Sequence, residues 1–469
     1  MRVFSVFLLT ILFLVFISYS QLFGMEYFFL VLSIGLLVFL VTCYLWYERR
    51  TILLAGILCN LFFLAMYYPI FGNAYSYYEV FSADVLKLQI GARSVLFSSI
   101  LCISALVFSG YVRRGEKSDF HFLVLACLYL LCSFYVSDAV FMAKTTYVLN
   151  SFLPVFLTLF FILKLEKGAS ILRRQEISAI YAVVYFILLL VVVYSLVLSD
   201  FYDVFRPDIV ASVRERDLLP LGYGLYPGPW WTQIESIEFI RLVGVFPDPI
   251  ILGYFLAVMS VVFLVDKKYL AFSVCACLLL LSLSKGAWLF CFNTVFLVIV
   301  FKYFKRIYIP ILLLLVVGQL IMAKYLNSSA AIHYYGLEGG LTSILSGVKT
   351  IFIGYGVGNG GNLASISAEG WERNSWLSSG SESGVGVLLF QLGFIGLGLV
   401  LLWLRKIYFI SSGKYNHAYS GWSISLVFAF FINSFLQENC INSSLLGILL
   451  LGVMLITSLG YIKQGRVCA

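Results

Sequence analysis

The chain has 469 residues, of which 62% are hydrophobic, 17% aromatic and 12% charged. Soluble globular domains carry roughly 25% charged residues, so this composition excludes a soluble enzyme, a disordered chain and a secreted disulfide scaffold. The formal net charge of +8 has to be divided between the two sides of a membrane before it says anything about partners, and nucleic-acid binding is not expected.

The sequence is a series of apolar runs of about 20 residues, the length that an α-helix needs to cross a bilayer. Strands of a membrane β-barrel alternate apolar and polar residues instead, so an all-α polytopic membrane protein is predicted, as one integral membrane domain over residues 1–469. We expect about 14 transmembrane helices, with 12 or 13 as alternatives because two runs are short or partly polar. The expected spans are 3–22, 26–47, 52–70, 92–112, 121–138, 146–164, 178–198, 247–265, 269–284, 287–304, 308–325, 385–404, 420–437 and 443–462.

Lysine and arginine occupy every second gap between these spans. The positive-inside rule places such gaps in the cytoplasm, and Arg2, Lys463 and Arg466 put both termini on the same side. The basic gaps hold Arg49, Arg50, Arg113, Arg114, Lys117, Lys164, Lys167, Arg173, Arg174, Lys267, Lys268, Lys302, Lys305, Arg306, Arg405, Lys406 and Lys414.

The first apolar run has an alternative interpretation. Arg2, an apolar core and the small residues Ser18 and Ser20 resemble a signal peptide with its cleavage site. A retained helix is favoured because the apolar stretch is long for a signal peptide and the next span follows within a few residues.

Cysteine and histidine give no sign of a metal or redox centre. Eight of the ten cysteines lie inside expected spans, where Cys behaves as a small hydrophobic residue. Cys440, in an external gap, has no partner there. The histidines His121, His333 and His417 are scattered, and no zinc spacing is present. We therefore expect no metal and no cofactor.

Two gaps on the acidic, external side are much longer than the rest. The first covers residues 200–246 and the second residues 325–384. Loops of this length in a compact protein are usually functional, and the cytoplasmic side shows no nucleotide-binding glycine pattern. We therefore expect the chemistry at these two external loops.

The first large loop combines arginines with a tryptophan pair. Trp230 and Trp231 stand in a turn rich in Gly and Pro, where an indole ring can stack on a sugar face. The alternative is an aromatic anchor at the membrane interface. The same loop holds Arg206, Arg214 and Arg216.

Two external cations stand at the starts of helices. Arg241 precedes the helix that begins after Pro247, and its planar guanidinium suits a diphosphate. Lys285 lies in a very short turn between spans 269–284 and 287–304, where an ionisable residue is a functional candidate. For both residues the alternative is a side chain that snorkels to the membrane surface.

The second large loop contains a glycine run, Gly354 to Gly361, whose backbone amides could approach an anion; a plain turn is the alternative. Glu372 and Arg373 follow, and Glu382 stands just before span 385–404. A carboxylate there either interacts with the helix dipole or acts as a general base.

In this order, the pieces resemble the superfamily of O-antigen polymerases and O-antigen ligases, which are bacterial envelope glycosyltransferases. The resemblance covers roughly residues 235–405 and consists of four loose motifs. These are Arg241-x-x-Gly244-x-Phe246-x-x-Pro249, Ser284-Lys285-Gly286-Ala287, Gly354-Tyr355-Gly356-Val357-Gly358, and Glu382-Ser383 followed by Leu388 to Gly396. Residues 1–200 match only in hydropathy.

The resemblance implies a fold like that of the GT-C glycosyltransferases, in the bacterial inner membrane, with the two large loops in the periplasm. It implies polymerisation of oligosaccharide repeat units carried on undecaprenyl diphosphate, which makes these glycans and membrane lipid the partners. A chain-length regulator and a flippase are further implied partners. An acceptor hydroxyl would attack the anomeric carbon of the donor, and undecaprenyl diphosphate would leave.

The resemblance also assigns roles to residues. Arg241 and Lys285 would neutralise the leaving diphosphate, with Arg206, Arg214, Arg216 and Arg373 as further contacts to phosphate or sugar. Glu382 would accept or position the hydroxyl proton, and Glu372 is the alternative. Trp230 and Trp231 would contact sugar, and no metal is required.

The motifs depart from the family in two places. Lys285 stands where the family carries Arg, which keeps the charge but loses the two-pronged geometry. Ligases carry a His near the helix after the large loop, whereas here Glu382 holds that place and His333 lies far upstream. This favours a polymerase, with transfer of polymer to the lipid A core by a ligase as one alternative. A flippase or solute transporter is the alternative from another class.

Overall fold

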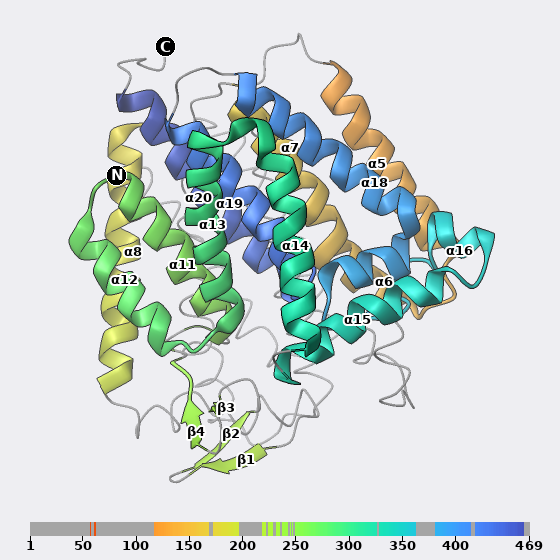
Figure 1. The fold of residues 1–469 in the computed structure, drawn as a ribbon, viewed down its shortest axis with the longest axis horizontal. Helices are drawn as coiled ribbons and strands as arrows, with labels where there is room; N and C mark the ends of the chain where they lie inside the picture. The colour runs from red at the N-terminus through yellow and green to blue at the C-terminus, as the bar shows by residue number, and fades with distance from the viewer. Residues whose placement is uncertain are drawn as a thin grey trace, which may run out of the picture.

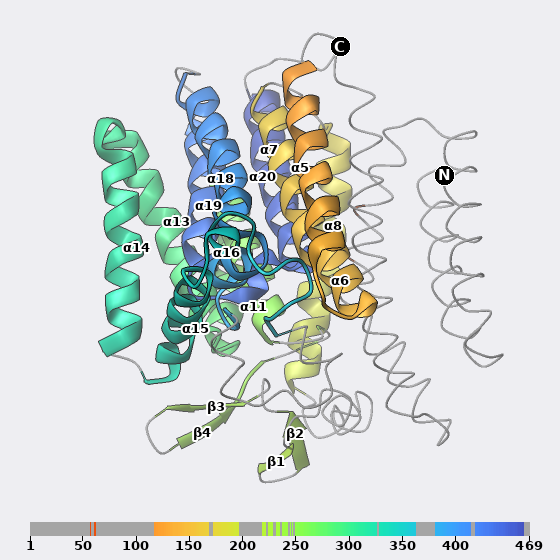
Figure 2. The ribbon, with the colours of Figure 1, turned by 90° about the vertical axis from the view of Figure 1, so that its right-hand side faces the viewer.

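The computed structural model describes residues 57, 61, 117–167, 172–196, 218–221, 224–227, 231–234, 237–242, 244, 246, 249–325, 328–362, 380–413 and 418–463. Most of these residues belong to long helices that run side by side, with four short strands gathered at one end of the helical bundle (Figures 1 and 2). The expected spans 3–22, 26–47 and 92–112, most of 52–70, and the signal-peptide alternative lie outside the described residues.

The other ten expected spans each coincide with helical structure. The stretch expected at 146–164 is formed by two α-helices joined by a short π-helical turn, η2. The helices are α5 (Lys117–Val136), α6 (Phe141–Tyr147), η2 (Val148–Phe152), α7 (Leu153–Glu166), α8 (Arg174–Leu196), α11 (Pro249–Val265), α12 (Tyr269–Leu281), α13 (Lys285–Tyr303), α14 (Tyr308–Tyr325), α18 (Gly384–Gly413), α19 (Ala418–Ser434) and α20 (Ser443–Lys463).

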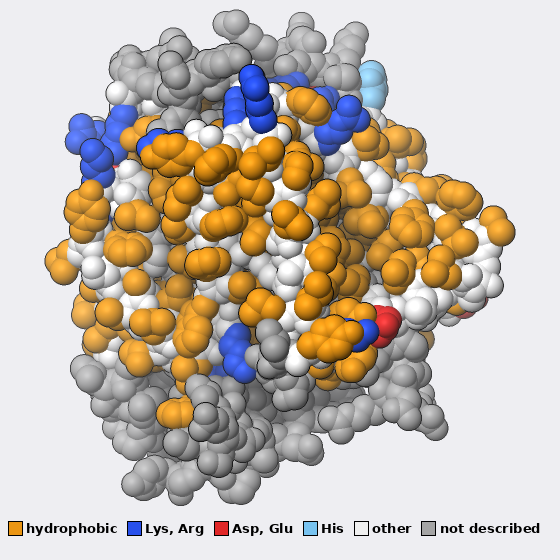
Figure 3. Space-filling model, viewed as in Figure 1, with side chains coloured by type: hydrophobic (Ala, Val, Ile, Leu, Met, Phe, Trp, Pro, Cys, Tyr) orange, Lys and Arg blue, Asp and Glu red, His pale blue; other side chains and the backbone are white. Residues whose placement is uncertain are grey.

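Six helical stretches in the described part are long and apolar enough to cross a membrane. Large apolar side chains are exposed on the outer helices, for example Leu313, Leu314 and Val317 on α14. The space-filling view shows an apolar belt between the two ends of the bundle, with Lys and Arg gathered near one end (Figure 3). Exposed apolar side chains around a bundle of this kind are typical of a helical membrane protein.

Helix α11 lies at the centre of the bundle and packs against α12, α13 and α20. Its 17 residues carry no charge, and nearly all of them are buried. Gly253 allows a close approach to α13, because a Cβ atom at this position would lie 2.7 Å from Cβ of Ser284. Small residues at such a crossing let two helix backbones come close together.

An ion cluster joins several helices at the basic end of the bundle. The carboxylate of Asp119 contacts Lys164 at 3.0 Å and Lys167 at 2.7 Å, and it also binds Lys406. Burial alone would raise the pKa of Asp119, but the three lysines outweigh burial and hold this pKa well below its usual range. The starts and ends of α5, α7 and α18 that carry these charges therefore lie on one side, as the charge pattern predicts.

The strands lie in the first large loop and form two antiparallel hairpins. Strands β1 (Leu218–Leu221) and β2 (Gly224–Pro227) pair with each other, as do β3 (Trp231–Ile234) and β4 (Ile237–Ile240). Each hairpin turns through two residues, the shortest connection between antiparallel strands. The helices-only expectation did not include these strands, because they are four residues long and no membrane-length pattern marks them.

The second large loop begins with two helices, which no apolar run of the sequence indicates. Helix α15 (Ser328–Ile344) packs against α14 and α18, and α16 (Val348–Ile353) packs against α18. Both helices lie alongside α14 and α18 rather than beyond their ends (Figures 1 and 2). Leu345, Val348 and Phe352 are exposed at and after the end of α15. The loop is therefore partly built into the bundle.

A break in α18 makes room for α16. Gly393 leaves the helical conformation, with φ 58° and ψ −165°. A Cβ atom there would lie 2.5 Å from the backbone of Phe352. Only glycine adopts this conformation at low cost, so Gly393 fixes where α16 meets α18.

The glycine run that follows α16 is packed rather than open. The amides of Tyr355 and Gly356 donate to the carbonyl groups of Phe390 and Gln391 at 2.8 and 3.1 Å, next to the break in α18. The Gln391 side chain accepts from the amide of Gly358 at 2.8 Å. Three amides of the run are thus used inside the protein, which favours the turn interpretation over an anion cradle.

We expect Gly393→Ala to lower the thermal unfolding midpoint of the protein in detergent. The added methyl group meets the Phe352 backbone, and the left-handed conformation is strained for alanine; the expected cost is about 2 kcal/mol. The matched control is Gly398→Ala in the same helix, where a Cβ atom meets nothing within 4 Å. An equal midpoint for both variants would contradict this account of the break.

Candidate functional site

Three of the predicted site residues, Arg241, Lys285 and Glu382, have described side chains. Trp231 is the first residue of β3, and its backbone pairs with Ile240. The remaining predicted site residues lie outside the described residues, together with the alternative base Glu372. They are Arg206, Arg214, Arg216, Trp230 and Arg373.

Arg241 follows β4 directly and is half-buried. The next residue, Leu242, donates its amide to the carbonyl of Leu281 at 3.2 Å. Leu281 is the last residue of α12, so the segment that carries Arg241 is fixed to the end of this helix. Phe246 is fully buried against the ring of Phe255, with 5.1 Å between ring centroids, and it anchors the segment at the start of α11.

Lys285 is exposed and is the first residue of α13. Only residues 282–284 separate it from α12, and Leu283 takes a left-handed conformation, with φ 48°, to make this tight turn. Because Leu242 is bonded to the end of α12, the segments of Arg241 and Lys285 lie at the same end of the α12–α13 pair.

The turn that carries Lys285 is joined to the connection between α19 and α20. The carbonyl of Gly286 accepts from the side chain of Asn433 at 2.8 Å. A Cβ atom at Gly286 would lie 3.2 Å from the side chain of Gln437. Gln437 in turn lies beside His333, with 3.5 Å between its Nε2 and Nε2 of the histidine. Packing therefore links the cationic turn to a group of ionisable side chains.

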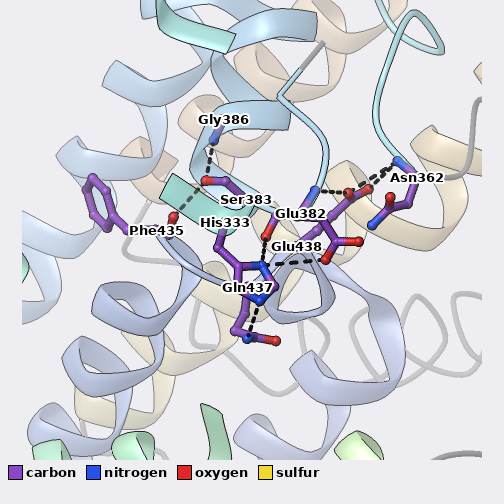
Figure 4. Close-up of polar contacts among 8 residues, drawn as sticks. All are labelled: His333, Asn362, Glu382, Ser383, Gly386, Phe435, Gln437 and Glu438. Carbon is purple, nitrogen blue, oxygen red and sulfur yellow. Dashed lines mark hydrogen bonds and ion pairs between the residues drawn. The ribbon is translucent and has the colours of Figure 1, made fainter. Parts of the chain in front are cut away.

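This group consists of Glu382, His333 and Glu438, which come from three distant parts of the chain (Figure 4). His333 lies on α15, and its Nδ1 is 3.0 Å from the carbonyl oxygen of Glu382 and 3.5 Å from Oε2 of the same residue. The side chains of His333 and Glu382 are 19% and 25% exposed. Both are accessible enough to meet a substrate.

The histidine contacts favour one tautomer. A carbonyl oxygen only accepts hydrogen bonds, so Nδ1 of His333 carries the hydrogen that it donates to Glu382. In a neutral ring this leaves Nε2 as an acceptor. The Glu382 carboxylate and His333 Nε2 are then two proton acceptors in one place.

Glu382 is held by the turn that precedes α18. Its backbone is left-handed, with φ 69°, and Gly380 before it also has a positive φ of 81°. Ser383 caps the helix, because its hydroxyl accepts from the amide of Gly386 at 3.0 Å and donates to the carbonyl of Phe435 at 2.8 Å. The cap fixes the direction in which the chain enters α18.

Glu438 begins the 3₁₀ turn η6 (Glu438–Ile441) between α19 and α20 and is buried. Its carboxylate accepts from the hydroxyl of Tyr147 and from the amides of Asn362 and Glu382, each at 3.1 Å for the shortest contact. Burial, and then the charge of Glu382, raise the pKa of Glu438 to about 8, against the effect of these hydrogen bonds.

Sequence reasoning did not find His333 and Glu438. His333 lies 49 residues before Glu382, and the packing of α15 against α18 brings it to the start of α18. Glu438 could have been identified from the sequence, because it is the single charged residue between the expected spans 420–437 and 443–462. Ionisable residues at such positions are functional candidates.

Among the described residues, no group of three or more His, Cys, Asp or Glu side chains is arranged to hold a metal ion. Comparisons of the chain with protein-family models, with curated proteins and with solved structures find no match.

The raised pKa of Glu438 predicts how stability changes with pH. Its pKa is about 8 in the folded protein and 4.5 ordinarily, so the folded state favours the protonated form. This contribution to stability is complete below about pH 4.5, shrinks as the pH rises and is lost above about pH 8.

The measurement is the thermal midpoint of the wild type and of Glu438→Gln in detergent across this range. Because glutamine does not titrate, we expect the midpoint of the wild type to fall relative to that of the variant as the pH rises from 4.5 to 8. A constant difference between the two proteins would contradict the raised pKa.

Proposed function

We propose that this chain is a membrane glycosyltransferase that joins oligosaccharide repeat units carried on undecaprenyl diphosphate. The product would be O-antigen or a related surface polysaccharide, made at the periplasmic face of the bacterial inner membrane. Support comes from a partly exposed pair of proton acceptors next to a turn that carries a cation, at the end of the bundle opposite to the lysine cluster around Asp119.

The single observation that carries the proposal is the contact between His333 and Glu382, with Nδ1 of the histidine 3.5 Å from Oε2 of the glutamate. A sugar hydroxyl is a poor nucleophile until a base takes its proton, and carboxylate and imidazole are the usual bases. The sequence motifs single out Glu382 independently. The contact adds a second base and gives the glutamate a fixed neighbour.

In the proposed reaction, the acceptor hydroxyl attacks the anomeric carbon of the donor glycan. The new glycosidic bond forms as the bond between that carbon and the diphosphate oxygen breaks. The hydroxyl proton passes to the Glu382 carboxylate or to Nε2 of His333, and the electron pair of the broken bond leaves with undecaprenyl diphosphate. Atoms and charge balance without a nucleotide.

The cations have a clear task in this reaction. Negative charge grows on the diphosphate as it leaves, and fixed positive groups stabilise such charge most when they are held in place beforehand. Arg241 is held by the bond between Leu242 and Leu281, and Lys285 by the packing of Gly286 against Gln437. We assign the diphosphate to these two residues and the reacting hydroxyl to Glu382 and His333.

We expect Arg241→Ala to abolish long glycan chains while the protein still accumulates normally in the membrane. Loss of one preorganised charge at a developing anion lowers a rate by about 100-fold or more. Arg241→Lys should keep part of the activity, because it keeps the charge and loses the planar fork. The readout is the glycan ladder on a gel.

The matched control is Arg405→Ala, which removes an exposed arginine of α18 that lies over the ring of Phe409. This variant should make chains of normal length. If cells with Arg241→Ala also made long chains, the assignment of Arg241 to the diphosphate would be wrong.

The placement of His333 favours a second candidate function. Ligases of the family that the motifs resemble carry a histidine near the helix after the large loop, and His333 lies against Glu382 at the start of this helix. Transfer of finished polymer to the lipid A core is therefore the alternative.

Deletion of the gene distinguishes the two functions. For a polymerase, we expect a single repeat unit on the lipid core of the deletion strain and no ladder. For a ligase, the core would carry no repeat unit, and the polymer would remain on undecaprenyl diphosphate. An unchanged ladder would contradict both functions.

A further inference from the structure

Two backbone positions of the second large loop, Asn362 and Glu382, meet at one buried side chain. We call these two positions the stems. Residues 363–379 between these points include Arg373, one of the predicted site residues. Both stems of this segment contact the same side chain, that of Glu438 (Figure 4).

Each of the two stems makes two hydrogen-bond contacts with Glu438. The amide of Asn362 lies 3.1 Å from Oε1 and 3.2 Å from Oε2 of Glu438. The amide of Glu382 donates to Oε2 at 3.1 Å, and the amide of Glu438 donates back to the carbonyl of Glu382 at the same distance. The buried carboxyl group of Glu438 therefore accepts hydrogen bonds from both stems, and the backbone amide of Glu438 donates a further bond to the carbonyl of Glu382.

This arrangement explains the backbone of Glu382. A residue other than glycine stays in the left-handed region only where its surroundings fix it, and Glu382 has φ 69°. Its amide is bonded to Glu438 and its carbonyl to both Glu438 and His333. These three bonds hold the peptide groups on either side of its Cα atom, and so fix the direction in which the side chain leaves the backbone.

We propose that Glu438 is a positioning residue, which clamps the stems at Asn362 and Glu382 together and thereby positions Glu382 for the substrate. The second half of this statement rests on the proposed function, whereas the clamp itself does not. Glu438 is buried, and its carboxyl group is bonded to both stems and to Tyr147, so we assign it no contact with substrate. Its task is to accept hydrogen bonds rather than to transfer a proton.

Two substitutions separate these tasks. Glutamine keeps the size of the side chain and one carbonyl oxygen. At the Oε2 position this oxygen still accepts from the amides of Asn362 and Glu382, while the side-chain NH2 group donates to the Tyr147 hydroxyl and only the bond from Asn362 to Oε1 is lost. Methionine keeps a similar volume but accepts no strong hydrogen bond. A clamp therefore tolerates Glu438→Gln and fails in Glu438→Met, whereas a proton-transfer group fails in both.

The first readout is amide hydrogen exchange of the purified protein, which requires no substrate. We expect faster exchange in the peptides around Asn362 and Glu382 in Glu438→Met and wild-type exchange in Glu438→Gln. The control is Glu166→Met, the same change at a buried glutamate that three serine hydroxyls hold at the other end of the bundle. It should leave both peptides unchanged. Equal exchange in all variants would overturn the clamp.

The second readout is glycan synthesis. We expect Glu438→Met to lower turnover by tenfold to about 100-fold, the scale for misplacing a reacting group, with a smaller change in KM, and Glu438→Gln to stay within about threefold of the wild type. Faster amide exchange at the two stems together with normal glycan synthesis would refute the positioning of Glu382. The Arg241→Ala variant tests the proposed function separately. If Glu438→Met does not accumulate, Glu438→Gln decides alone: inactivity in a folded Glu438→Gln overturns the proposal.

Discussion

Backbone amides and carbonyls that are buried among apolar side chains need partners inside the protein, and this constraint shapes the half of the bundle that carries the candidate site. The break at Gly393 frees the carbonyls of Phe390 and Gln391, and the glycine run after α16 supplies the amides that meet them. Where the same loop ends, the amides of Asn362 and Glu382 find a buried carboxyl group instead. The fold of the loop and the geometry of the candidate site thus come from one requirement.

Hydropathy and charge predicted the helical part well because both act over short stretches of sequence. Every expected span within the described residues coincides with a helix, and Lys164, Lys167 and Lys406 meet at one end around Asp119, as their shared side in the charge pattern required. Helices α15 and α16 escaped prediction because α15 carries several polar residues and α16 has only six residues. The place of α16 also depends on a glycine in another helix.

The candidate site was predictable only in pieces for the same reason. Motifs marked Arg241, Lys285 and Glu382 by their places at helix starts, but nothing local in the sequence connects Glu382 to His333, 49 residues away. Gln437 and Glu438 lie in the connection between α19 and α20 and join the cationic turn to this pair. The division of work that we propose follows from burial: the partly exposed pair of His333 and Glu382 meets the substrate, and the buried carboxyl group of Glu438 holds Glu382 in place.

The most direct test of the proposed function uses the purified protein in liposomes with a purified repeat unit on undecaprenyl diphosphate. We predict that glycan chains of increasing length appear together with free undecaprenyl diphosphate, one molecule for each new linkage, and that Glu382→Gln forms neither. Movement of the lipid-linked unit across the bilayer without new linkages would contradict the account and identify a transporter.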